Sequence, residues 1–113
     1  MLTIDALRSY GANVDEGLQR CMNNEAFYLR LAKMVVEDGN YERLQTALAG
    51  GDLDAAFEAA HALKGALGNL ALTPMSAPVT ELTELLRHKT PGDYQALCGT
   101  IMRQRDALKA LID

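Results

Sequence analysis

Four long stretches of this chain carry apolar residues at helical spacing, and a turn or capping signal precedes each stretch. In one of them the apolar positions are three or four residues apart, at Leu53, Ala56, Phe57, Ala60, Leu63 and Leu67. This spacing predicts an amphipathic helix. Asp52 stands directly before it and is a favourable N-cap residue. No segment shows the alternation of a β-strand, so the pattern predicts an all-α fold.

The N-terminal third of the chain predicts shorter helices. Thr3 can cap a helix that Gly11 ends, and a second short helix is expected from about Val14 to Met22. Asn23-Asn24 then caps a longer helix. Its apolar period is interrupted at Asp38-Gly39-Asn40, which leaves open two helices or one kinked helix.

Thr73-Pro74 has the chemistry of a helix start, with Thr73 as the N-cap. Pro78 either kinks this helix or moves its start toward Ser76. Thr90-Pro91-Gly92-Asp93 resembles a capping box that opens the last helix. Four long amphipathic segments with short turns predict an antiparallel up-and-down four-helix bundle, with short additional N-terminal helices over one end.

Length and charge narrow the possible functions. The chain has 113 residues, which indicates one domain over residues 1–113 with a single core. A net charge of −4 with dispersed basic residues disfavours nucleic-acid binding. Cys21 and Cys98 form no CxxC motif and are expected to be reduced thiols. No signal peptide or membrane-spanning run is evident, so we expect a cytoplasmic monomer that does not associate with membranes.

The stretch from Ala60 to Gly68 has an unusual composition for a helix interior. It contains two glycines, each of which costs roughly 1 kcal/mol relative to alanine in a helix. On a helical wheel, Gly65 and Gly68 lie about 40° and 20° from His61, on either side, and Lys64 lies about 60° away toward the apolar face. His61 is therefore expected on an exposed stripe without side chains, where another molecule can reach its imidazole.

Simpler interpretations of this stretch exist. A lone histidine on a helix usually has no chemical role. Paired glycines could also allow another helix of the same chain to pack closely. His88, in Arg87-His88-Lys89, fits a cationic helix C-terminus. With His61 it could in principle ligate a haem or a metal inside the bundle, but no cysteine or carboxylate cluster accompanies the two histidines.

The motif His61-Ala62-Leu63-Lys64-Gly65-Ala66, with Gly68 after it, resembles the signature of the histidine-containing phosphotransfer (HPt) domain family. Gly50-Gly51-Asp52 resembles the family's Gly-Asp turn, and residues 11–18 resemble its usual N-terminal start. Two positions depart from the family pattern. Many members have Leu-Gly where this chain has Leu70-Ala71, and a glutamine on the next helix where it has Thr83.

The resemblance implies an all-α bundle and a phosphorelay function. His61 would accept a phosphoryl group from the aspartate of one receiver domain and pass it to another. Lys64 would disfavour the imidazolium form and compensate the phosphoryl charge. Gly65, Gly68 and Ala62 would form the partner-binding surface.

The partners implied are response-regulator receiver domains, with a hybrid sensor kinase as a further candidate. The receiver would supply Mg²⁺, so no cofactor or metal of the chain's own is expected. No nucleotide-binding motif is present, which predicts a phosphocarrier and not a kinase. The alternative is a non-catalytic helical module that binds and sequesters receiver domains, although such a module would not need His61.

Overall fold

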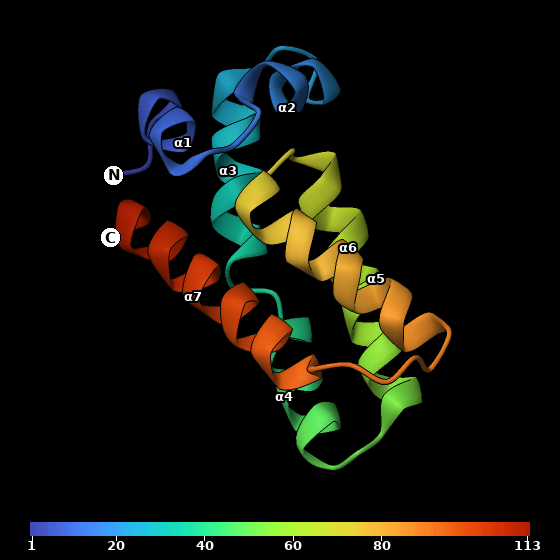
Figure 1. Ribbon diagram of the computed structural model, residues 1–113. Helices are drawn as coiled ribbons and strands as arrows, with labels where there is room; N and C mark the ends of the chain where they lie inside the picture. The colour runs from blue at the N-terminus through green and yellow to red at the C-terminus, as the bar shows by residue number, and fades with distance from the viewer.

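The computed structural model describes all residues from 1 to 113, and they form seven helices and no strand (Figure 1). The helices are α1 (Ile4–Tyr10), α2 (Val14–Arg20), α3 (Glu25–Val35), α4 (Asn40–Ala49), α5 (Leu53–Asn69), α6 (Thr73–Arg87) and α7 (Tyr94–Ile112). The prediction of an all-α fold is confirmed.

The last four helices close into a bundle. α5 packs between α4 and α6, and α7 packs against α6 and α4, so each helix contacts two others. Successive helices run in opposite directions (Figure 1). The antiparallel up-and-down arrangement predicted from the apolar spacing is therefore present in the structure.

The centre of the bundle is lined by small and branched apolar side chains. On α5 the fully buried face is formed by Ala56, Ala59, Ala60, Leu63 and Leu67. Three of these five residues are alanines, so neighbouring helices can approach the α5 backbone closely. Two partly buried members of the predicted stripe, Leu53 and Phe57, border this face.

The N-terminal helices cover one end of the bundle. α1 lies beside the C-terminal half of α7 (Figure 1), where the Tyr10 hydroxyl donates a hydrogen bond of 3.0 Å to the Gln104 carbonyl. The predicted caps are present, since Thr3 and Asn24 accept hydrogen bonds from the first turns of α1 and α3. α2 ends at Arg20 and is shorter than predicted, because Met22 already has a positive φ of 58°.

The segment for which the sequence left two possibilities forms two helices. α3 ends at Val35 and α4 begins at Asn40. Between them, the carboxylate of Asp38 accepts a hydrogen bond of 2.8 Å from the Asn40 N–H. This turn offsets α4 from α3, so that α4 alone belongs to the four-helix bundle.

Two predicted helix starts are wrong in detail. Leu72 is the N-cap of α6, and the Thr73 hydroxyl instead donates a hydrogen bond to the Ala71 carbonyl. Asp93 caps α7 by accepting a hydrogen bond of 2.9 Å from the Ala96 N–H. The capping box at Thr90 is therefore absent, because the helix begins three residues later than such a box requires, at Tyr94.

α6 is one continuous helix that passes through Pro78, so the alternative start at Ser76 is wrong. Pro78 has no N–H and leaves one carbonyl of the preceding turn without its helical donor. None of the seven helices combines the length and the apolar character needed to cross a membrane.

Candidate functional site

The local sequence explains why α5 presents His61 in its middle. Asp52 caps the helix by accepting a hydrogen bond of 3.1 Å from the Ala55 N–H, and Asp54 places a negative charge in the first turn. The apolar stripe of α5 faces the bundle core. His61 lies on the opposite side, and its side chain is exposed as the helical wheel predicts.

The imidazole of His61 is stacked on an aromatic ring one helical turn earlier. The ring centroids of Phe57 and His61 are 5.5 Å apart, and the two planes are inclined by 13°. The guanidinium of Arg87, from α6, lies 5.0 Å from the centroid of the same Phe57 ring. The Phe57 ring thus lies against the imidazole, which restricts the orientation of the imidazole while the His61 side chain remains exposed.

The two glycines of the motif face open space. A Cβ added to Gly65 or to Gly68 would meet no other atom within 4 Å. The interpretation that these glycines allow another helix of this chain to pack closely is therefore wrong. The Gly68 carbonyl accepts a hydrogen bond from the Arg20 guanidinium of α2. Ala62, which follows His61 in the chain, is also exposed, on the side of α5 that faces α4.

Lys64 is held by a carboxylate of the neighbouring helix. Its Nζ lies 3.5 Å from Oε1 of Glu84 on α6, and the Lys64 side chain is 35% exposed. The same carboxylate is 3.5 Å from Nε of Arg87 and 3.9 Å from Nε2 of His88. Glu84 is thus the centre of a small charged cluster along the edge between α5 and α6.

The charge state of Glu84 follows from this cluster. Partial desolvation raises the pKa of the Glu84 carboxyl, but Arg87 and then Lys64 outweigh this effect and hold the pKa below its usual value. Glu84 is therefore ionised at neutral pH. His88 belongs to this cluster through Glu84, and no group of three or more potential metal ligands occurs in the structure.

The structure shows the surroundings of Thr83 and Ala71, the two positions that depart from the family pattern. Thr83 is fully buried, and its hydroxyl donates a hydrogen bond of 2.7 Å to the Val79 carbonyl. It therefore presents no polar group to the surface near His61. Ala71 has a φ of +54°, a left-handed conformation that favours glycine. A glycine at this position, as in the family pattern, would suit this backbone better than the alanine of this chain.

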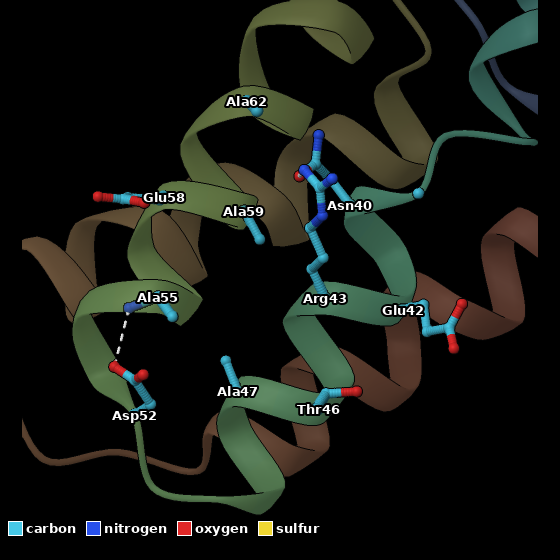
Figure 2. A pocket seen from close by; sticks show the side chains of 11 residues that line it. Asn40, Glu42, Arg43, Thr46, Ala47, Asp52, Ala55, Glu58, Ala59 and Ala62 are labelled. Carbon is cyan, nitrogen blue, oxygen red and sulfur yellow. Dashed lines mark hydrogen bonds between the residues drawn. The ribbon is translucent and has the colours of Figure 1, made fainter.

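A groove runs between α4 and α5 (Figure 2). It borders the exposed stripe of α5 on the side opposite to Glu84. Figure 2 shows Ala47, Ala55 and Ala59 facing the gap between the two helices, with Ala62 at one end. Arg43 lies along the α4 side and donates a hydrogen bond of 3.4 Å to Asn40. The groove has a small-residue floor and polar walls that carry charges of both signs.

Sequence reasoning identified His61, Lys64, Gly65, Gly68 and Ala62, and the structure places them on one side of α5 and its border with α6. It missed Phe57 as a neighbour of His61, although the spacing of four residues on one helix was a usable signal. It also missed Glu84 and Arg87, because their proximity depends on how α6 packs against α5.

The fold and the site together define an all-helical bundle with an exposed histidine on an open helix face. The family model described as Hpt domain matches residues 38–113, which include all of α4 to α7. The chain belongs to the Hpt domain family. Hpt domains are phosphocarrier modules of two-component phosphorelays and work with receiver domains. No curated protein and no solved structure matches the chain significantly.

Proposed function

We propose that this chain is a histidine phosphocarrier in which His61 accepts a phosphoryl group from a receiver aspartate and passes it to another receiver. The observation that carries this proposal is the exposure of His61 beside Gly65 and Gly68, where an added Cβ would meet nothing. The matched family supports the class of reaction. Residues 1–113 would act as one domain, because the hydrophobic core includes residues from all seven helices.

The transfer step requires an unprotonated imidazole nitrogen. Its lone pair attacks phosphorus, the N–P bond forms, and the bond from phosphorus to the aspartate oxygen breaks. The aspartate leaves as a carboxylate, and the other ring nitrogen can release its proton to water. The reverse sequence transfers the group to the next receiver.

The residues around His61 have distinct tasks in this proposal. Phe57 restricts the orientation of the ring, which favours an in-line approach of phosphorus. The ammonium of Lys64 compensates charge on the phosphoryl oxygens. Gly65, Gly68 and Ala62 leave room for the receiver's loops. The receiver supplies Mg²⁺ together with the phosphorylated aspartate, and the reaction takes place in the cytoplasm.

The test uses the two histidines as a matched pair. A receiver domain carrying ³²P on its aspartate is mixed with wild type, His61→Gln and His88→Gln in the presence of Mg²⁺. We expect label on wild type and on His88→Gln, and none on His61→Gln. Both positions are exposed, so each variant should retain its stability within roughly 0.5 kcal/mol. Label on His61→Gln would contradict the proposal.

The alternative, a module that sequesters receivers without turnover, makes a different prediction. It requires wild type and His61→Gln to bind the receiver equally, with no label on either protein. Pull-down of the receiver together with the labelling assay therefore separates the two functions.

A further inference from the structure

Glu84 is shared by three cationic or potentially cationic side chains. Lys64 reaches it from α5, at 3.5 Å, while Arg87 and His88 reach it from the end of α6, at 3.5 and 3.9 Å. Lys64 is therefore the only one of the three partners that comes from the helix carrying His61.

The ion pair with Glu84 holds the ammonium of Lys64 toward α6. On the α5 wheel, Lys64 lies about 60° from His61, on the side of α6. Its four-carbon stem is flexible, and a lysine ammonium acts as a point charge without the fixed geometry of a guanidinium. The ammonium can therefore exchange one anionic partner for another without movement of the backbone.

We propose that Glu84 is a positioning residue that competes with the phosphoryl group on His61 for the ammonium of Lys64. This inference rests on the proposed function of His61. A phosphoryl group carries a charge of about −1.5 to −2, against −1 for the carboxylate, so it is the stronger partner when present. Glu84 is not left unpaired when Lys64 leaves, because Arg87 remains 3.5 Å from its carboxylate.

The competition has a consequence for the energy of the phosphorylated state. Lys64 stabilises the phosphoryl group only after its pair with Glu84 is broken, so the net stabilisation is smaller than that from a free lysine. Phosphohistidine therefore remains a better phosphoryl donor than it would be beside a free lysine. The effect is on the order of two- to fivefold in an equilibrium constant, the range available to a partly exposed ion pair.

The measurement is the equilibrium constant for transfer between a receiver phosphorylated on its aspartate and this protein, from the forward and reverse rates. This constant depends only on the separate proteins, so changes in docking affinity cancel. The variants are Glu84→Gln, Lys64→Gln, the double variant, and Glu81→Gln as the matched control. Glu81 is exposed and one turn earlier on the same helix.

We expect Glu84→Gln to shift the equilibrium two- to fivefold toward phosphohistidine, beyond any shift from Glu81→Gln. In the Lys64→Gln background, Glu84→Gln should have no further effect beyond that of the control. A purely structural role of Glu84 would instead change the unfolding temperature without this dependence on Lys64.

Two results overturn the inference while the proposed function stands. The first is an equal shift from Glu84→Gln and Glu81→Gln. The second is a Glu84→Gln shift that persists without Lys64, which would mean that Glu84 repels the phosphoryl group directly. Absence of label on wild-type His61 would instead overturn the proposed function, and this inference with it.

Discussion

The hydroxyl of Tyr28 donates a hydrogen bond of 2.8 Å to the carbonyl of Leu70, joining the first turn of α3 to the C-terminal end of α5. Gly17 of α2 lies against this contact. A Cβ at position 17 would be 2.7 Å from the Leu70 oxygen and 2.7 Å from the Tyr28 ring. α2 and α3 thus pack against the end of α5, the helix that carries His61. This contact leaves no room for a methyl group at position 17.

Gly17→Ala should therefore destabilise the protein by about 1–3 kcal/mol, because both neighbours are a backbone carbonyl and a buried ring that cannot easily move. Urea unfolding measures the loss. Gly65→Ala is the matched control, since its Cβ meets no atom and helix propensity improves. Equal stability of Gly17→Ala and wild type would show that Tyr28 and Leu70 can move away from position 17 without cost.

The same contact predicts an alkaline limit of stability. Burial, and secondly the nearby Cys21, raises the pKa of Tyr28 to about 12. Its neutral form is therefore favoured by folding, and the associated stability is complete below pH 10 and is lost as pH rises toward 12. The pKa values of Tyr10 and Tyr41 are also raised by burial. Urea titrations between pH 8 and 12 should show falling stability, with a shallower fall for Tyr28→Phe.

Ala71→Gly should stabilise the protein by about 0.5–1 kcal/mol. The left-handed conformation at φ +54° costs alanine roughly 1–2 kcal/mol, and loss of the buried methyl group offsets part of the gain. Thermal unfolding provides the measurement. Ala107→Gly, at an exposed position inside α7, should lose about 1 kcal/mol instead. A destabilised Ala71→Gly would mean that burial of the methyl group outweighs the backbone strain.

Substitutions at Gly65 separate stability from transfer. Gly65→Ala and Gly65→Gln should each stabilise the protein by up to ~1 kcal/mol, because helix propensity improves and the position faces open space. Gly65→Gln should also impair transfer from a phosphorylated receiver, since a long side chain one turn from His61 would meet the receiver's loops. Gly65→Ala should retain transfer.

The measurements are thermal unfolding and the transfer rate for both Gly65 variants. A Gly65→Gln protein with normal transfer would remove the steric part of the proposed function, leaving His61 and Lys64 as its support.

The helices could be predicted from sequence wherever a side chain acts as the cap. Thr3, Asn24 and Asp52 all accept the hydrogen bonds expected of them. The start of α6 could not be predicted in this way, because the left-handed turn at Ala71 sets where the helix begins and Leu72 caps it without a side-chain hydrogen bond.

The candidate site also contains features that the sequence predicts and one that it does not. The positions of His61, Gly65 and Gly68 follow from the period of one helix, and their exposure agrees with the structure. The link from Lys64 to Glu84 depends on the packing of α5 against α6, which no local pattern contains. The resemblance of residues 11–18 to the family's N-terminal start lies outside the matched range and stays a prediction.

The stacking of Phe57 on His61 has a consequence for the order of events in a relay. The lone pair of a ring nitrogen lies in the plane of the imidazole, and a stack that restrains this plane gives the donor and the acceptor receiver the same direction of approach to one nitrogen. Under the proposed function, the donor must depart before the acceptor can arrive, which is ping-pong kinetics. An excess of either receiver in its product form would then slow phosphoryl transfer, because it would occupy the approach to His61 that both receivers share.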